Sequence, residues 1–217
     1  MTDFPKHQLY GRRQGRPLRK QKQELFDNLL PKIAYAKNKL SFDKPLFLEI
    51  GFGGGEHLAF QGQRYPDNHF LGCEPFINGV ADLLEQIWEG EIQNITIHHG
   101  DVRFVLEELP NGSLDGAYIL FPDPWPKPRH HKRRIVNKDV LNQLASLLKP
   151  GAFLRVASDH SDYVSWMREH LDQTEALQKV TEFQTADISR PDDWPKTRYE
   201  QKGLAGMIST FFIYKRK

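Results

Sequence analysis

Residues 46–56 read Leu-Phe-Leu-Glu-Ile-Gly-Phe-Gly-Gly-Gly-Glu, a short apolar run that leads directly into a cluster of glycines. The apolar run has the length and composition of a β-strand. Glycines that follow a strand allow a tight turn into a helix and let the backbone approach a ligand closely. The motif therefore predicts a strand, a ligand-binding turn and a helix in succession.

The same alternation continues along the chain, with short apolar runs separated by stretches of helical period. Strands are predicted at 46–50, 69–73, 95–98, 116–121, 152–157, 177–183 and 207–214. Helices are predicted at 23–39, 55–64, 77–88, 102–108, 137–148 and 160–171, the first of them kinked or split at Pro31. Such alternation is typical of an α/β, doubly wound and mostly parallel sheet.

The length and composition limit the class of protein. The 217 residues suffice for one domain, which we expect over 23–217. Residues 1–22 are basic and non-periodic and predict a flexible N-terminal arm. No apolar stretch is long enough to span a membrane or to form a secretory signal, and the single Cys73 excludes an internal disulfide framework. These features favour a cytoplasmic protein.

The glycine turn also indicates what kind of cofactor binds. A dinucleotide fingerprint would require a third glycine at position 56, where this chain has Glu56. A carboxylate there would face the pyrophosphate of NAD or FAD, so a nicotinamide dehydrogenase is disfavoured. The turn suits a cofactor that has a positive centre and no phosphate.

Acidic residues occur at three successive strand ends, Glu49, Glu74 and Asp101. Ligands of doubly wound folds bind beyond the carboxyl ends of the strands. A cationic amino acid part, a ribose and an adenine would match this series of carboxylates, with the backbone of Gly51 and Gly53 close by. The pattern predicts S-adenosyl-L-methionine, although each acid taken alone could be a helix cap or a surface charge.

The fourth predicted strand ends in Phe-Pro-Asp-Pro-Trp-Pro-Lys at 121–127. Prolines on both sides restrict the backbone around Asp123 and so fix the direction of its carboxylate. Trp125 could stack on a base or could shield the end of the sheet. Asp159, after the fifth strand, could contact substrate or cap the next helix.

Positive charge is concentrated in two places. The first 23 residues carry seven Lys and Arg against a single Asp, and residues 127–134 contain five Lys and Arg with two histidines. Such clusters are typical of proteins that bind RNA or DNA, although a solvated surface run has the same composition. The paired histidines lack any cysteine cluster and do not indicate a metal site.

Three motifs together resemble a known family. Glu-Ile-Gly-Phe-Gly-Gly-Gly at 49–55, Phe-Pro-Asp-Pro-Trp-Pro-Lys-Pro-Arg-His-His-Lys-Arg-Arg at 121–134 and Thr-Arg-Tyr-Glu-Gln-Lys at 197–202 are similar to bacterial tRNA (guanine-N(7)-)-methyltransferases. The resemblance covers essentially residues 20–217 and implies a seven-stranded, Rossmann-like class I S-adenosylmethionine-dependent methyltransferase fold with an antiparallel last strand. It also implies methylation of N7 of guanosine 46 in the variable loop of tRNA.

The resemblance assigns roles to individual residues. It implies that Asp123 is catalytic and that the cofactor is bound by Glu49, Gly51, Gly53, Glu74, Asp101 and Asp123. It implies substrate contacts from Lys127, Asp159, Thr197, Arg198, Tyr199 and Glu200. RNA would be held by Arg129, His130, His131, Lys132, Arg133 and Arg134.

Two alternatives stay open at this point. Amino-group nucleic-acid methyltransferases carry an Asp/Asn-Pro-Pro-aromatic motif after the fourth strand, and Asp123-Pro124-Trp125 is one proline shorter. A non-catalytic RNA-binding protein of the same fold is the second alternative. The expected partners are tRNA and S-adenosylmethionine, without a membrane or a metal, and the chain would act as a monomer or homodimer.

Overall fold

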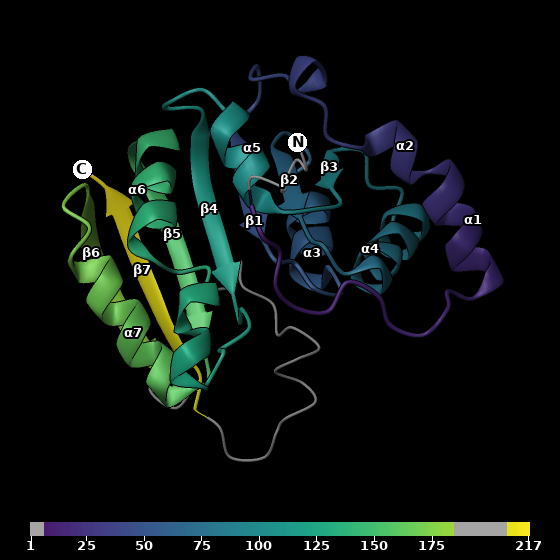
Figure 1. Ribbon diagram of the computed structural model, residues 1–217. Helices are drawn as coiled ribbons and strands as arrows, with labels where there is room; N and C mark the ends of the chain where they lie inside the picture. Colours follow the sequence, from purple (N-terminus) through teal and green to yellow (C-terminus); the bar gives the residue numbers. More distant parts are fainter. Residues whose placement is uncertain (1–6, 185–207) are drawn as a thin grey trace, which may run out of the picture.

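The computed structural model describes residues 7–184 and 208–217, and its centre is a single sheet (Figure 1). Seven strands follow the order β3-β2-β1-β4-β5-β7-β6. Their bounds are β1 Leu46–Ile50, β2 His69–Cys73, β3 Ile95–His98, β4 Leu114–Leu120, β5 Leu148–Ser158, β6 Leu177–Gln184 and β7 Thr210–Arg216. Strands β1 to β5 pair in parallel, whereas β7 lies antiparallel between β5 and β6. The predicted fold class, including its antiparallel last strand, is confirmed.

Helices cover both faces of the sheet. The helices are α1 Lys20–Asn28, α2 Leu30–Ile33, α3 Glu56–Arg64, α4 Ile77–Glu89, α5 Val102–Glu108, α6 Lys138–Leu147 and α7 Ser161–Asp172, with 3-10 turns η1 Lys37–Lys39 and η2 Pro128–Arg133. Apolar residues of α5, α6 and α7 form one buried cluster with the sheet. Residues of α3 and α4 form a second cluster, against which α1 and α2 pack. The crossovers therefore produce a doubly wound, three-layered domain.

Strand β1 shows how the alternation of side chains separates the two faces. Leu46, Leu48 and Ile50 belong to the cluster under α5 to α7. Phe47 points to the other face, where its ring stacks on Phe70 at a centroid distance of 5.4 Å. Because side chains alternate along a strand, Glu49 lies on the same face as Phe47, beneath α3.

Several boundaries differ from the prediction by a few residues, and two of these differences have an identifiable reason. Strand β5 begins at Leu148 instead of 152, because Leu148 pairs with Leu114 before an irregularity in the ladder. The intervening Pro150-Gly151, which follows the helix predicted at 137–148, lies inside this distorted strand. The helical segment expected over 23–39 begins earlier, at Lys20, and divides at Leu29 with Pro31 in the first turn of α2, as predicted for this proline.

None of the helices in the described part of the chain combines the length and hydropathy that a bilayer span requires. Within residues 7–184 and 208–217, no group of three or more His, Cys, Asp or Glu side chains is arranged to hold a metal ion.

Candidate active site

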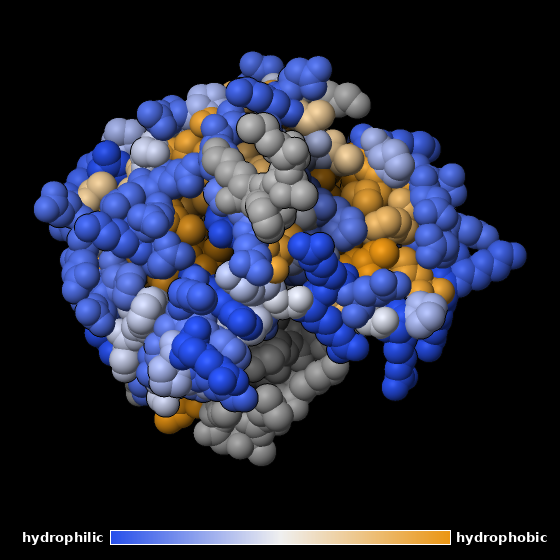
Figure 2. Space-filling view, viewed as in Figure 1, coloured by the Kyte–Doolittle hydropathy of each residue, from blue (hydrophilic) through white to orange (hydrophobic). Residues whose placement is uncertain are grey.

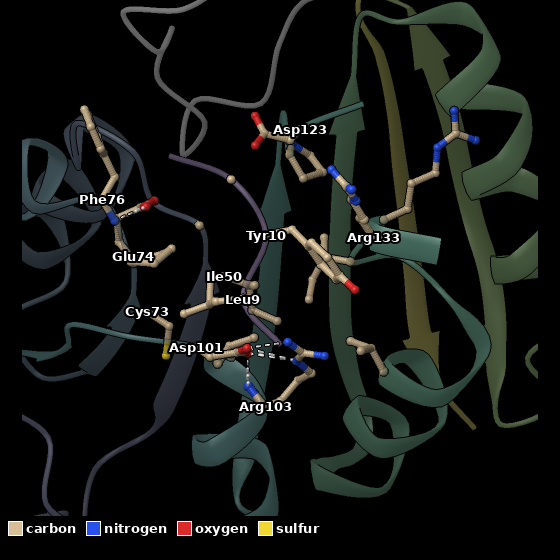
Figure 3. Close-up of a pocket in the computed structure, with 18 of the residues that line it drawn as sticks. Leu9, Tyr10, Ile50, Cys73, Glu74, Phe76, Asp101, Arg103, Asp123 and Arg133 are labelled. Atoms are coloured by element: carbon tan, nitrogen blue, oxygen red, sulfur yellow. Dashed lines mark hydrogen bonds and ion pairs between the residues drawn. The ribbon is translucent and has the colours of Figure 1, made fainter. Parts of the chain in front are cut away.

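A cavity of about 450 Å³ lies at the carboxyl ends of the parallel strands (Figure 3). Its wall combines the glycine turn after β1, the ends of β2 to β4, and residues 9–12 of the N-terminal segment. Glu74, Asp101 and Asp123 all line it, so three of the predicted acids meet in one place. This is the position that doubly wound folds use for ligands.

The glycine turn presents its backbone to the cavity. Gly51 and Gly53 both line the cavity and have φ values of 71° and 56°. A Cβ atom at either position would meet no atom within 4 Å, so it would project into open space. Glycine supports this left-handed conformation without steric cost and leaves room for a ligand against the chain.

Glu74 fastens the glycine turn to the start of α4. Its two carboxylate oxygens accept hydrogen bonds of 2.9 Å from the backbone N–H groups of Gly53 and Phe76. Burial raises the pKa of Glu74, opposed by these two hydrogen bonds and reinforced by the negative charges of Asp123 and Glu49. Glu74 thus holds the turn in shape and also places negative charge in the cavity.

Asp101 is the N-cap of α5 and the partner of Arg103. Its carboxylate accepts a 3.0 Å hydrogen bond from the Arg103 backbone N–H and contacts the Arg103 guanidinium at 2.5 Å. Burial works against ionisation, but the hydrogen bonds and charge of Arg103 outweigh it and lower the pKa of Asp101. Asp101 therefore stays anionic at the cavity wall.

Asp123 occupies a strained turn at the rim of the cavity. Phe121 and Trp125, on either side of it, have positive φ values of 51° and 44°. A non-glycine residue in this region costs on the order of 1–3 kcal/mol and persists only where its surroundings fix it. Asp123 itself is exposed, yet adjoining atoms of the cavity wall partly desolvate its carboxylate and raise its pKa.

The N-terminal segment crosses the cavity, which sequence reasoning missed. The Arg103 guanidinium donates to the Gln8 carbonyl at 2.9 Å, and the Ile77 N–H at the start of α4 donates to the Arg13 carbonyl at 3.0 Å. Between these points Leu9, Tyr10, Gly11 and Arg12 form part of the cavity wall. These backbone contacts leave no periodic pattern in the sequence, and only Leu9 and Tyr10 signalled that the segment could pack.

A guanidinium lies over two aromatic rings beside Asp123. The guanidinium of Arg133 lies 4.6 Å from the ring centroid of Tyr10 and 5.0 Å from that of Trp125. Figure 3 shows Arg133 next to Tyr10 on the Asp123 side of the cavity. Trp125 is half-buried in the cavity wall. Its flat surface therefore belongs to the site and not to the core of the sheet.

Comparison with known proteins places the chain in a family. A family model described as "Putative methyltransferase" matches residues 43–209. A tRNA (guanine-N(7)-)-methyltransferase of Zymomonas mobilis subsp. mobilis is 43% identical over 216 residues, covering 96% of this chain and 94% of the relative. One of Sphingopyxis alaskensis is 44% identical over 229 residues, covering 97% and 95%. The chain belongs to the tRNA (guanine-N(7)-)-methyltransferase family.

Solved structures agree with this family at the level of the fold. An antibiotic-related methyltransferase superposes with a TM-score of 0.62 at 16% identity, covering 85% of this chain and 96% of that one. A 16S rRNA (adenine(1408)-N(1))-methyltransferase from Catenulisporales acidiphilia gives 0.55 at 15% identity, covering 96% and 98%. Both support a class I methyltransferase fold for this family member.

The side chain of Glu49, predicted to bind the cofactor, points from β1 towards helix α3. It is not among the described residues that line the cavity. Its carboxylate instead contacts Nδ1 of His57 at 2.7 Å, and His57 Nε2 contacts the amide of Gln61 at 3.2 Å. All three side chains are buried. In this structure Glu49 supports the first turn of α3 behind the glycine loop.

The basic run divides into exposed and buried members. Lys127, Arg129 and Lys132 are exposed around η2, His130, His131 and Arg133 are partly buried, and Arg134 is fully buried. Asp159 is half-buried and lies outside the described lining of the cavity. Figure 2 shows strongly hydrophilic residues gathered below the β4 arrowhead of Figure 1. The remaining predicted substrate residues, Thr197, Arg198, Tyr199 and Glu200, lie outside the described residues.

Proposed function

We propose that this methyltransferase transfers the methyl group of S-adenosyl-L-methionine to N7 of guanosine 46 in the variable loop of tRNA. The observation that carries the proposal is the convergence of Glu74, Asp101 and Asp123 in one cavity next to the basic run at 127–133, of which Lys127, Arg129 and Lys132 are exposed. Membership of the tRNA (guanine-N(7)-)-methyltransferase family supplies the class of reaction and of substrate. The chain would do this in the cytoplasm, as a monomer or homodimer.

The cavity suits S-adenosylmethionine in both charge and shape. The open space beside Gly51 and Gly53 leaves room for a ligand against the backbone. The carboxyl groups of Glu74, Asp101 and Asp123 line the same cavity and would attract the cationic part of this ligand. We assign Glu74 to the ribose hydroxyls, Asp101 to the adenine amino group and Asp123 to the amino acid part and the reacting base.

The reaction requires placement more than proton transfer. S-adenosylmethionine supplies an electrophilic methyl group on its sulfonium. N7 of guanine has an in-plane lone pair and no proton, so no general base is obligatory. Holding the two reactants in line can lower the barrier by roughly 7–11 kcal/mol. A fixed carboxylate at the position of Asp123 would also stabilise the positive charge that develops on the purine.

The surface beside the cavity would hold the RNA. We assign phosphate contacts to Lys127, Arg129, Lys132 and Arg133, whose cations would replace condensed counterions, and further contacts to the RNA to His130 and His131. Asp159 and residues 197–200 would complete the contacts to the guanosine. Trp125, in the cavity wall, offers a face for stacking.

The decisive experiment combines the protein with methyl-labelled S-adenosylmethionine and unmodified tRNA, followed by nucleoside analysis. The expected product is 7-methylguanosine, and a tRNA carrying adenosine at position 46 should accept almost no label. A label on an amino group of adenine or cytosine would identify an amino-group methyltransferase. If the protein binds tRNA but no nucleoside becomes labelled, it would be a non-catalytic RNA-binding protein.

A further inference from the structure

We infer that Arg134 is a positioning residue that holds the strained turn carrying Asp123, and that it does not grip RNA phosphate. The inference rests on the catalytic role proposed for Asp123. Arg134 is the last member of the basic run at 127–134. By composition alone, it cannot be distinguished from the exposed cations that precede it in this run.

The surroundings of Arg134 differ from those of a surface cation. Its side chain is 0% exposed. The guanidinium lies 4.8 Å from the ring centroid of Tyr163 and 4.9 Å from that of Trp166. Its Nη2 group pairs with the carboxylate of Asp162 in the first turn of α7. A buried cation is retained in a protein where its charge is paired, and here Asp162 pairs the charge while the buried Nη1 group has no hydrogen-bond partner among the described residues.

The remaining contact of this guanidinium reaches the catalytic turn. Nε of Arg134 donates a 2.9 Å hydrogen bond to the carbonyl oxygen of Pro124. That oxygen belongs to the peptide group between Pro124 and Trp125, whose orientation is set by the ψ angle of Pro124 and the φ angle of Trp125. The hydrogen bond therefore acts on the residue whose φ is 44°, outside the conformations that L-residues prefer.

The other end of the turn is fixed independently. The N–H of Phe121 donates to the carbonyl of Ala157 on β5 at 2.9 Å, which continues the sheet to the start of the turn. Asp123 thus lies between one end held by the sheet and one end held by Arg134. Without the second restraint, the backbone at Trp125 can relax and the carboxylate of Asp123 can move.

Arg134 is itself held by rigid elements. Its carbonyl accepts a 2.8 Å hydrogen bond from the side chain of Asn137, the N-cap of α6. Two residues along, the Val136 carbonyl accepts a 2.6 Å hydrogen bond from the Trp166 indole of α7. The guanidinium therefore connects α7 to the turn, while the backbone of Arg134 is fixed to the start of α6, and two directed N–H donors on one group are supplied by the planar fork of arginine.

The test replaces Arg134 by lysine, which keeps the charge but lacks Nε–H and the fork. We expect the single-turnover rate at saturating S-adenosylmethionine and tRNA to fall about 10- to 100-fold, because a displacement of about 1 Å has that effect on a positioned group. The dissociation constant for tRNA and its salt dependence should stay within about twofold, because the buried guanidinium neutralises no phosphate. Asp162→Asn should also lower the single-turnover rate, but by a smaller factor than Arg134→Lys.

The matched control is Arg168→Lys. Arg168 lies on α7 and pairs with Glu182 of β6 at 2.6 Å, so the variant also breaks an arginine–carboxylate pair of that helix but touches no part of the turn. It should reduce the thermal midpoint without changing the single-turnover rate. Adding Arg134→Lys to Asp123→Asn should cause little further loss, because the group being positioned is already absent.

Three results would overturn the inference. A reduced salt dependence with an unchanged rate would make Arg134 a phosphate contact. A reduced thermal midpoint with unchanged rate and affinity would make it purely structural. A full further loss in the Asp123→Asn background would show that it acts on something else. If Asp123→Asn alone retains the wild-type rate, the role proposed for Asp123 fails, whatever Arg134 does.

Discussion

Gly53 and Gly112 share a left-handed backbone but differ in their position relative to the cavity. Their φ values are 56° and 63°, and a Cβ atom would meet nothing within 4 Å at either. Only Gly53 lines the cavity and donates its N–H to Glu74. Substitutions at these two glycines therefore distinguish the conformational cost of adding a side chain from the effect of that side chain on ligand binding.

We expect Gly53→Ala and Gly112→Ala each to lose about 1–2 kcal/mol of unfolding free energy, the cost of a left-handed L-residue. Only Gly53→Ala should also weaken binding of S-adenosylmethionine, by about tenfold or more, because its methyl group enters the binding space, where overpacking costs about 1–3 kcal/mol. Urea unfolding and titration calorimetry measure the two effects. Equal cofactor affinity in both variants would show that the cofactor does not approach this turn.

Asp123 carries the central prediction at the residue scale. Asp123→Asn preserves shape and removes the charge, so we expect the single-turnover rate to fall by about 10²- to 10³-fold, the range for loss of one electrostatic stabiliser. Affinity for tRNA should change little, because the phosphate contacts stay. A single-turnover rate close to that of the wild type would refute the assignment.

The raised pKa of Asp123 gives this prediction a pH signature. Partial desolvation favours the neutral acid, so the anion that catalysis requires is lost at a higher pH than for an ordinary aspartate. The rate of the wild-type enzyme should fall as the pH drops through that raised pKa. The residual rate of Asp123→Asn should lack this acid limb.

At the scale of elements, Asp101 links helix α5 to the cavity. It caps the helix and pairs with Arg103, and its pKa is lowered in the folded protein. A carboxylate whose folded pKa lies below its unfolded value stabilises the fold above the unfolded pKa, about 3.9 for aspartate. That stability is lost as the pH falls through the folded pKa.

Asp101→Asn isolates this charge, because asparagine is an equally good N-cap. We expect the variant to be about 1 kcal/mol less stable than the wild type at pH 7, the typical net value of a hydrogen bond. The difference should shrink below about pH 4 and vanish in stronger acid. Urea unfolding at a series of pH values measures it, and a difference that does not depend on pH would assign the loss to packing.

The sequence predicts the elements well where a local period determines them. Strand β1 and helix α5 match their predicted bounds, and the acids at the ends of β2, β3 and β4 do meet in one cavity. Glu49 shows the limit of this reasoning. Alternation indicates that Glu49 faces away from Ile50, but its partner depends on which helix covers that face and on a histidine eight residues further along.

The burial of Arg134 and the packing of the N-terminal segment could not be predicted from the sequence for a related reason. Nothing in a run of cations distinguishes the member that turns inward, because burial of Arg134 depends on Tyr163 and Trp166 of a helix some 30 residues away. In addition to the ring contacts of Tyr10 and Arg12, backbone carbonyls and one backbone N–H hold the segment at 8–15. Such backbone contacts are independent of side-chain pattern, so composition predicted only a flexible arm.

At the scale of the whole molecule, the fold separates charge into two zones. The carboxylates of Glu74, Asp101 and Asp123 lie at the strand ends that line the cavity, whereas Lys132 and Arg133 line it from the basic run, which also carries the exposed Lys127 and Arg129. A negatively lined pocket attracts a cationic cofactor, and a positive rim attracts a polyanion. The two zones adjoin because both follow from the loops at the carboxyl ends of the same parallel strands.

This separation predicts how tRNA binding responds to salt. Arg129 and Lys132 are both exposed. Lys44 is an exposed lysine just before β1, at the amino ends of the parallel strands and so opposite the cavity. If the rim holds RNA, Arg129→Ala/Lys132→Ala should reduce the slope of log affinity against log salt by about 0.7–0.9 for each phosphate that the variant no longer neutralises. Lys44→Ala should leave the slope unchanged. The affinity for S-adenosylmethionine should stay unchanged in all variants. Equal slopes for the double variant and Lys44→Ala would mean that the tRNA approaches the cavity from another side.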